Sequence, residues 1–343
     1  MRVGVLTGGG DCPGLNAVIR AIVRKAERCH DAEVIGFLDG WAGVVERRTM
    51  PLDIETMRGT LPRGGTILGT SRSNPELLEN GLPGCLDSLE ALGVDSLIVI
   101  GGDGTLGVAE RLHRLGGPVV GVPKTIDNDI SGTEYTFGFN TALQIATDAI
   151  DRLHTTAESH DRVMIVEVMG RYVGHVAVHA GMAAGATVTL IPEYPFDIAE
   201  VAERLVRRHD RGRYASIVVV AEGAVPKPGT MDLPDPGVDD FGNPKLGGIS
   251  AHIAREVEAR TGYDTRVTVL GHVQRGGTPT AYDRVLSTRY GVAAIDAVMD
   301  GDHGTMVALQ ADQIVRVPLA DVVGRPKPVS PQLYEDCAQW FFA

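Results

Sequence analysis

Long apolar runs are absent from this 343-residue sequence. No stretch approaches the roughly 20 apolar residues that a helix needs to cross a bilayer. The N-terminus begins directly with a strand-like segment and lacks the charged region and apolar core of a signal peptide. We therefore expect a soluble protein of the cytoplasm that does not bind membranes.

Cysteine is also scarce, and basic residues are outnumbered by acidic ones. The four cysteines, Cys12, Cys29, Cys85 and Cys337, have no CxxC spacing, which argues against a disulfide scaffold and against zinc or redox chemistry. The 32 Lys and Arg residues face 44 Asp and Glu, and the net charge of −12 argues against a nucleic-acid-binding surface. An anionic substrate must then be bound by arginines concentrated in one place.

Glycine, in contrast, is abundant. The 43 glycines have no collagen-like period, so they indicate many tight turns between strands and helices. Strand-like apolar runs alternate with helical stretches such as 141–156 and 197–209. This alternation predicts an α/β fold of doubly wound, mostly parallel sheets, and the length suits two such domains with the active site in the cleft between them. The strand-like runs are 3–6, 34–37, 97–100, 118–122, 163–168, 188–191, 217–221 and 267–270.

Polar loops follow three of these runs. Residues 8–14 lead from a strand into a helix, and both glycine N–H groups and a helix N-terminus favour negative charge. Residues 101–105 and 124–129 follow two further strands and should reach the same edge of a sheet. Any one of these loops alone would as readily be a plain turn, but the carboxylates among them can hold a hard cation and accept a proton from a hydroxyl. Together they indicate phosphoryl transfer.

A fourth glycine turn, 63–66, leads to Arg72. A planar guanidinium there could clamp phosphate oxygens with two hydrogen bonds, although a lone arginine is more often a solvated surface charge. The turn-rich stretch 225–248 is predicted to be a tolerated surface loop without a catalytic role.

Five motifs, in sequence order, resemble those of the bacterial-type 6-phosphofructokinase family, and those of its actinobacterial members most of all. They are residues 9–16, 101–105, 123–129, 169–171 and 271–277. The resemblance implies the phosphofructokinase fold, with a larger phosphoryl-donor domain of residues 1–138 plus about 276–325. The smaller sugar-phosphate domain would comprise residues from about 139 to 275 and the C-terminal segment 326–343.

The resemblance also implies an activity: transfer of a phosphoryl group from MgATP to the 1-hydroxyl of fructose 6-phosphate, a step of glycolysis. Asp127 matches the family's catalytic base, and Asp103 and Asp129 match the carboxylates that organise Mg²⁺. Such a transfer needs positioning and charge neutralisation more than covalent catalysis. The positions that match contacts to the phosphoryl donor or the transferring phosphate are Gly10, Arg72, Gly102, Asp103, Gly104, Thr105, Lys124, Thr125 and Arg171.

For the sugar phosphate, the resemblance implies a cationic clamp and a hydroxyl-binding carboxylate. Glu222 matches that carboxylate, and Met169, Gly170 and Arg171 match residues that line the same pocket. In the family some of the clamp arginines come from a neighbouring subunit, which here would be Arg162 and Arg266, so a homo-oligomer, dimer or tetramer, is expected. The clamp on the 6-phosphate matches Arg162, Arg266, His272 and Arg275.

Two neighbouring positions bear on the phosphoryl donor and favour different answers. In the family, Asp at position 104 obstructs the α-phosphate and accompanies pyrophosphate use, whereas Gly104 leaves room for ATP. Lys124 is typical of pyrophosphate-dependent relatives, although some ATP-dependent actinobacterial members combine it with Gly104. Val108 stands where well-known ATP-dependent enzymes have glycine, and it is expected to narrow the ribose or adenine pocket. We favour ATP, because a carboxylate at 104 would repel a nucleotide phosphate, and keep pyrophosphate as the alternative.

Two other functions remain open. One keeps the chemistry but changes the acceptor, for example to sedoheptulose 7-phosphate. The other is a non-catalytic sugar-phosphate sensor, against which the intact Asp103, Asp127, Asp129 and Arg171 argue.

Allosteric control is expected to be altered or lost. Four arginines fall where the family's effector-binding cations occur: Arg20, Arg24, Arg211 and Arg213. Four residues that regulated bacterial enzymes have as Arg, Asp, Arg and Glu are here Ile54, Gly59, His154 and Thr187.

Overall fold

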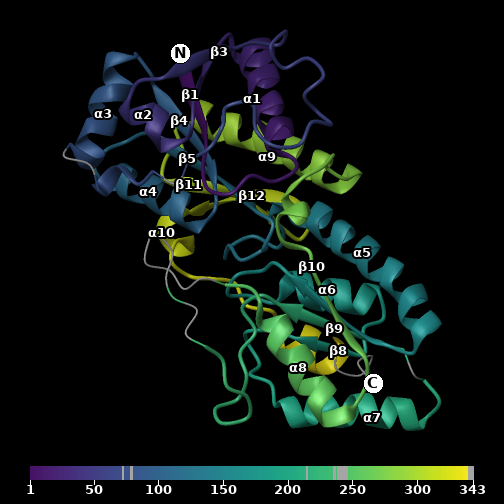
Figure 1. Cartoon of the computed structure of the whole chain (residues 1–343). Helices are drawn as coiled ribbons and strands as arrows, with labels where there is room; N and C mark the ends of the chain where they lie inside the picture. Colours follow the sequence, from purple (N-terminus) through teal and green to yellow (C-terminus); the bar gives the residue numbers. More distant parts are fainter. Residues whose placement is uncertain (72, 78–79, 214, 235–236, 238–245, 339–343) are drawn as a thin grey trace. The chain divides into compact units, whose positions relative to one another are not determined.

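The computed structural model describes residues 1–71, 73–77, 80–213, 215–234, 237 and 246–338 (Figure 1). Arg72 and much of the expected 225–248 loop lie outside this range. The chain divides into two compact units. Unit 1 comprises Met1–Ile126, Ile130–Thr141 and Arg275–Pro326, and unit 2 comprises Asp127–Asp129, Ala142–Gln274 and Lys327–Ala343.

Unit 1 is built on one twisted sheet. Its described strands run in the order β12-β11-β5-β4-β1-β2-β3, with β6 beside β5. The central strands are parallel, whereas the edge strands β3 and β12 are antiparallel to their neighbours. The strands are β1 (Arg2–Thr7), β2 (Glu33–Phe37), β3 (Thr49–Leu52), β4 (Ser96–Gly101), β5 (Val119–Thr125), β6 (Phe137–Gly138), β11 (Thr305–Gln310) and β12 (Gln313–Pro318).

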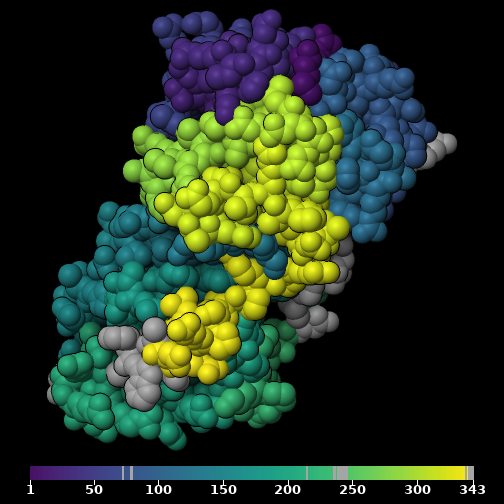
Figure 2. Space-filling view, turned by 180° about the vertical axis from the view of Figure 1, so that it is seen from behind, coloured from purple at the N-terminus to yellow at the C-terminus, as the bar shows by residue number. Residues whose placement is uncertain are grey.

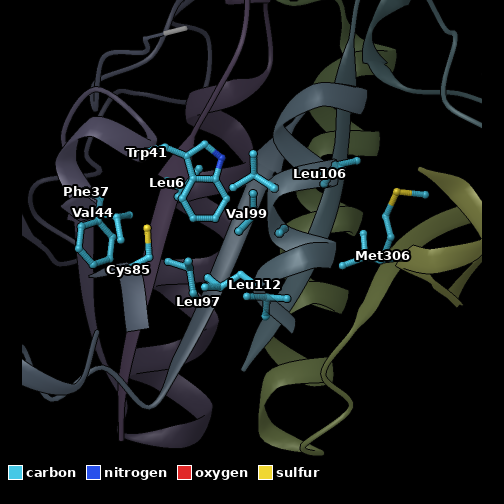
Figure 3. Packing of buried hydrophobic residues seen from close by; sticks show 14 of the residues in the cluster. Leu6, Phe37, Trp41, Val44, Cys85, Leu97, Val99, Leu106, Leu112 and Met306 are labelled. Carbon is cyan, nitrogen blue, oxygen red and sulfur yellow. The ribbon is translucent and has the colours of Figure 1, made fainter. Parts of the chain in front are cut away.

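Helices cover both faces of this sheet (Figure 1). Because side chains alternate along a strand, Leu97 and Val99 of β4 join a hydrophobic cluster with Trp41 and Leu112, which come from helices on one face (Figure 3). The helices α1 and α9, far apart in the sequence, pack against each other and belong to the other face. The helical elements of unit 1 are α1 (Leu15–His30), α2 (Trp41–Val45), η1 (Pro75–Leu77), α3 (Gly81–Ala91), α4 (Asp103–Arg114), α9 (Ala281–Met299) and α10 (Leu319–Val322).

Unit 2 holds a smaller parallel sheet in the order β10-β7-β9-β8. One face, with Ile165, Leu190 and Val218, packs under α7 and α8, and α6 packs against β8 and β9. The strands are β7 (Val163–Val168), β8 (Val188–Leu190), β9 (Ser216–Ala221) and β10 (Thr265–Val269). The helical elements are α5 (Phe139–His160, which begins in unit 1), α6 (His175–Ala183), α7 (Ile198–Asp210), α8 (Ile249–Thr261), η2 (Gly271–Arg275) and η3 (Gln332–Ala338).

The C-terminal part of the chain is shared between the two units. In Figure 2 the lime atoms of α9 border the purple N-terminal atoms, and yellow atoms from the end of the chain lie on the teal surface of unit 2. Contacts agree with the picture, because the Tyr334 hydroxyl donates to the Thr189 carbonyl at 3.1 Å. No helix in the described part of the chain has both the length and the apolar character needed to cross a membrane.

Helix ends differ from the sequence prediction by a few residues. The predicted helix 141–156 lies within the longer α5, Phe139–His160. The helix after the N-terminal glycine loop, α1, ends at His30, where Asp31 adopts the left-handed conformation. The predicted helix 197–209 begins one residue before α7, because Asp197 is the N-cap of that helix. The Asp197 carboxylate accepts a hydrogen bond from Ala199 N at 2.8 Å.

Candidate active site

The parallel register of three adjacent strands brings three loops of unit 1 to one edge. Thr7 of β1 pairs with Ile100 of β4, and Gly101 pairs with Pro123 of β5. The turns that start at Gly8, Gly102 and Ile126 therefore leave the same edge of the sheet, as the sequence predicted.

Two of these turns meet at the Thr105 side chain. A Cβ at Gly8 would lie 2.6 Å from Thr105 Cγ2, and one at Gly101 would be closer still to the same side chain. Glycine at both positions thus lets the β1 and β4 loops approach each other through Thr105, which is 9 % exposed. The predicted donor-site residues Gly102 and Thr105 lie at the start of α4, where unpaired N–H groups favour phosphate.

Two cations are fixed on the backbone of the N-terminal glycine loop. Lys124, which is 3 % exposed, donates from Nζ to the Gly10 carbonyl at 2.5 Å. Arg275 donates from Nη1 to the Asp11 carbonyl at 3.3 Å, and a Cβ at Gly10 would overlap its guanidinium. The sequence assigned Arg275 to the sugar phosphate; in the structure its guanidinium lies against the loop predicted to bind the donor.

Two of the positions that bear on the choice of donor, Gly104 and Val108, lie on α4. Nothing within 4 Å would meet a Cβ at Gly104, so open space lies in front of it. Val108, expected to narrow a nucleotide pocket, is instead 4 % exposed and belongs to the hydrophobic core cluster. The helical period turns it toward the sheet, away from solvent.

The fourth glycine turn is tied to the first helix. Asn16 donates to the carbonyl of Arg63 at 3.0 Å and accepts from Ile67 N at 2.9 Å. The Thr70 hydroxyl then donates to the Gly9 carbonyl at 2.6 Å, so residues 63–70 support the N-terminal loop. Arg72 itself lies outside the described residues.

Unit 2 holds the predicted base in a tight turn. Asp127 follows Thr125, the last residue of β5, by two positions and is 7 % exposed. Asn128, 3 % exposed, has a φ of 55°, the left-handed conformation that asparagine tolerates better than most residues. Asp129 is half-buried, and its carbonyl accepts from Lys327 N at 2.8 Å.

The carboxyl edge of the unit 2 sheet gathers the predicted sugar-site residues. Arg171, with a φ of 52°, donates its backbone N–H to Glu222 Oε1 at 3.1 Å. The Glu222 N–H in turn donates to the Val168 carbonyl at the end of β7. Next to them, Met169 N donates to Oε1 of the fully buried Gln274 at 3.4 Å. Hydrogen bonds thus tie Arg171 to Glu222 and Met169 to Gln274.

Arg162 and Arg266 lie at the opposite edge of that sheet. Arg162 precedes β7 and Arg266 is the second residue of β10, whereas Arg171 follows β7. Six strand residues at about 3.3 Å each separate the two edges by roughly 20 Å. Both arginines form ion pairs with Asp264. Within one chain they are not brought together with Arg171 and Glu222, and the exposed His272 lies in η2 at the carboxyl edge.

Burial sets the charge of two groups near these loops. Burial raises the pKa of the Cys12 thiol to about 12, so this cysteine beside the donor loop stays protonated and unreactive. Burial also lowers the pKa of His175 in α6 to about 4, so its imidazole is neutral at pH 7.

Two of the residues that replace the effector-binding residues of regulated bacterial enzymes form hydrogen bonds within unit 2. His154 hydrogen-bonds to the Ala184 carbonyl at 2.6 Å, and the buried Thr187 accepts from Ile217 N at 3.3 Å. Both substitutions thus stabilise the fold locally.

The predicted Mg²⁺ carboxylates fit a cation that arrives with phosphate. Within the described residues, no three or more His, Cys, Asp or Glu side chains cluster so as to hold a metal ion. Asp103 is exposed at the start of α4, and its Oδ1 accepts from Gly324 N at 2.8 Å. One or two carboxylates completed by phosphate oxygens and water are the ligands that Mg²⁺ commonly takes.

Comparison with known proteins assigns the fold and the loops to one family. Residues 2–298 match the phosphofructokinase family. The chain belongs to the phosphofructokinase family.

Two relatives and two solved structures illustrate the match. The pyrophosphate--fructose 6-phosphate 1-phosphotransferase of Streptomyces coelicolor is 58 % identical over 342 residues, covering 99 % of this chain and 100 % of the relative. The ATP-dependent 6-phosphofructokinase of Mycobacterium tuberculosis is 55 % identical with the same coverage. Saccharomyces cerevisiae phosphofructokinase has a TM-score of 0.81 and 34 % identity over 93 % of this chain, which spans only 45 % of the yeast chain. The pyrophosphate-dependent enzyme of Marinobacter aquaeolei has a TM-score of 0.83 over 100 % of this chain and 91 % of that one; at 21 % identity it supports the fold alone.

The family assignment confirms the resemblance inferred from the motifs and the predicted α/β fold. As a phosphofructokinase, the chain is a phosphoryl-transferring enzyme whose family uses Mg²⁺ and a phosphoryl donor. Relatives with either donor in their names are almost equally similar, so the family alone does not choose between ATP and pyrophosphate.

Three residues that contact the predicted residues or their neighbours were not singled out from the sequence. Asp264, which pairs with Arg162 and Arg266, had a signal, since it lies two positions before Arg266. Gln274 stood within a recognised motif, but its burial under Met169 was not foreseen. Lys327 lies about 200 residues from Asn128, so only the tertiary fold reveals their contact.

Proposed function

We propose that this chain transfers a phosphoryl group from MgATP to the 1-hydroxyl of fructose 6-phosphate, giving fructose 1,6-bisphosphate in glycolysis. Asp127 carries this proposal: it is a nearly buried carboxylate in a fixed turn, two residues after the strand that ends in Lys124 and Thr125. A general base must be held in a fixed position where a hydroxyl proton can reach it, and the fixed turn around Asp127 supports this role.

The residues have distinct roles in the proposed reaction. Asp127 accepts the proton of the 1-hydroxyl as that oxygen attacks the terminal phosphoryl group. Thr125 and Arg171 contact the transferring phosphate, as does Arg72. Glu222 accepts hydrogen bonds from sugar hydroxyls, because Arg171 N holds one of its oxygens in place. Mg²⁺, when bound with the donor, would neutralise phosphate charge, and Asp103 and Asp129 would hold it.

ATP is the proposed donor because of Gly104. Open space in front of this residue accommodates an α-phosphate, and the absence of a carboxylate there avoids like-charge repulsion. Pyrophosphate is the second candidate, favoured by Lys124. The Lys124 ammonium, which donates to the Gly10 carbonyl, is a compact positive charge beside the loop proposed to bind the donor. Such a charge suits either donor.

The chain is further proposed to act as a homo-oligomer, dimer or tetramer, in the cytoplasm. Arg162 and Arg266 lie about 20 Å along the sheet from Arg171, so they would complete the 6-phosphate clamp in the site of a neighbouring copy.

Steady-state assays test the donor and the acceptor together. Fructose 6-phosphate with ATP and with pyrophosphate, in the presence of Mg²⁺, should give the higher kcat/KM with ATP. Turnover with pyrophosphate alone would reverse the donor assignment. A higher kcat/KM for sedoheptulose 7-phosphate would replace the acceptor, and no turnover on any sugar phosphate would favour the sensor.

A further inference from the structure

The last segment of unit 2 is anchored next to the turn that contains Asp127. The backbone N–H of Lys327 donates to the Asp129 carbonyl at 2.8 Å, and the Lys327 carbonyl accepts from His175 Nε2 at 3.0 Å. Two positions further on, Val329 N donates at 2.9 Å to Glu193 Oε1, which also accepts from Gly174 N at 3.0 Å. The backbone of Lys327 is therefore held from both sides.

The side chain of Lys327 turns to the same turn. Its Nζ donates to Asn128 Oδ1 at 3.0 Å. Asn128 is 3 % exposed and lies between Asp127 and Asp129 with a φ of 55°. Lys327 thus contacts the turn at two points, through its backbone at Asp129 and through its ammonium at Asn128.

The groups around Lys327 define the charge it meets. Asp127 and Asp129 carry the two carboxylates of the turn, while α6 presents His175 and His179 and the Glu193 carboxylate binds the following segment. Burial lowers the pKa of both histidines, and the positive charge of Lys327 lowers it further. At neutral pH the imidazoles are therefore neutral, and Lys327 brings a positive charge to the turn that carries Asp127 and Asp129.

We propose that Lys327 is a positioning residue for phosphoryl transfer: through its hydrogen bonds to Asn128 and to the Asp129 backbone it fixes the turn that carries Asp127. This inference rests on the proposed function, because it assigns Lys327 to the base of that reaction. A base that is misplaced lowers the rate of the chemical step more than the binding of the sugar.

The test compares Lys327→Met with Lys327→Arg. The Met variant should lose about 10–100-fold in kcat, the usual cost of removing a residue that orients a ligating or reacting group. Its KM for fructose 6-phosphate should stay close to the wild-type value. The Arg variant keeps the charge and a donor for the Asn128 side chain, and it should recover most of the wild-type kcat. Lys227→Met is the matched control, since Lys227 forms an exposed ion pair with Glu200 in the same unit.

A double-variant cycle tests the route through Asn128. Asn128→Gly tolerates the left-handed φ but removes the side-chain acceptor. If Lys327 acts through that side chain, Lys327→Met should cost less in the Asn128→Gly background than in the wild type. Additive losses would overturn the route.

A readout without turnover checks that the ammonium lies where described. In Lys327→Met, the His175 imidazole should titrate at a higher pH by NMR, because the neighbouring positive charge is gone. If that shift appears while kcat matches the wild type, the positioning role is wrong. If Lys327→Met fails to fold, the single variant Asn128→Gly decides in its place: it should lower kcat with the KM for fructose 6-phosphate unchanged, and a wild-type kcat would overturn the proposal. Absence of turnover in the wild-type enzyme would instead defeat the proposed function itself.

Discussion

The two units build the sheet edges that we propose as binding sites by different means. In unit 1, the loops at the sheet edge are shaped by glycines and by backbone carbonyls that hold Lys124 and Arg275. In unit 2, the corresponding edge is shaped by side chains, in which Glu222 and Gln274 accept from the backbone of the Arg171 loop. A polyphosphate presents many equivalent oxygens that N–H groups and cations can approach without a Cβ in the way, whereas a sugar has hydroxyls that need oriented acceptors. The difference predicts that activity falls when side chains are added to the loops of unit 1 and when side chains are removed from the loops of unit 2.

Removing one carboxylate from unit 2 should have the largest effect. Asp127→Ser should lower kcat by about 10³–10⁴-fold, because the general base is lost. The KM for fructose 6-phosphate should change little, since the base acts in the transition state. Steady-state kinetics with isothermal titration of the sugar phosphate measure both quantities.

The control for Asp127→Ser is Asp151→Asn, which changes an exposed carboxylate on α5. It should leave both constants unchanged. A wild-type kcat in Asp127→Ser would remove this residue from the role of base.

Adding one carboxylate to unit 1 should have the next largest effect. Gly104→Asp should lower kcat/KM for ATP by about 100-fold, since a like charge beside a phosphate costs several kcal/mol. Gly104→Ala is the matched variant: its Cβ meets nothing within 4 Å, so it should remain close to the wild type. Measuring kcat/KM of both variants with ATP and with pyrophosphate separates the effect of the added charge from that of the added volume. An equal loss of kcat/KM for ATP in both variants would mean that space rather than charge selects the donor.

Arg162 and Arg266, at the other edge of the unit 2 sheet, test the comparison in a different way. We propose that they bind the sugar phosphate in the site of another copy of the chain. Arg162→Ser should raise the KM for fructose 6-phosphate by about 10–100-fold, the range for losing a charged hydrogen bond. Mixing this variant with Asp127→Ser under conditions that exchange subunits should restore low-KM activity, because some hybrid sites then contain both native residues. If mixed oligomers form but low-KM activity is not restored, Arg162 acts within its own chain.

Sequence periodicity predicted the parts of the fold that depend on local pattern. Runs such as 97–100 and 163–168 became β4 and β7, and glycine-rich turns at strand ends were correctly placed at the sheet edge. The antiparallel strands β3 and β12 were missed, because short half-exposed edge strands have weak apolar signals. Their pairing depends on the strand next to them.

Side-chain placement was harder to predict than strand order. Arg275 was grouped with His272 from their shared motif, yet η2 directs its guanidinium to the Asp11 carbonyl of unit 1. Val108 was assigned to a pocket from its position in a motif, whereas packing of α4 on the sheet buries it. Both outcomes depend on contacts between segments more than 100 residues apart or on the rotation of a helix, which a linear motif does not contain.

The smallest predicted effect is a difference in acid sensitivity between the units. In unit 2, His175 has a folded pKa of about 4, below its unfolded value, so the unfolded state binds the proton first and stability falls as the pH drops from about 6.5 toward 4. In unit 1, burial raises the pKa of Asp283, so this group favours the folded state increasingly as the pH falls through its folded pKa. The slope of stability against pH from His175 is at most about 1.4 kcal/mol per pH unit.

Hydrogen exchange at pH 7 and pH 5 should therefore show a greater loss of protection in β9 than in β4. His175→Gln keeps a donor for the Lys327 carbonyl and should reduce that loss, whereas His160→Gln, at an exposed site, should not. Equal loss in both sheets would mean that these two buried groups do not set the acid response.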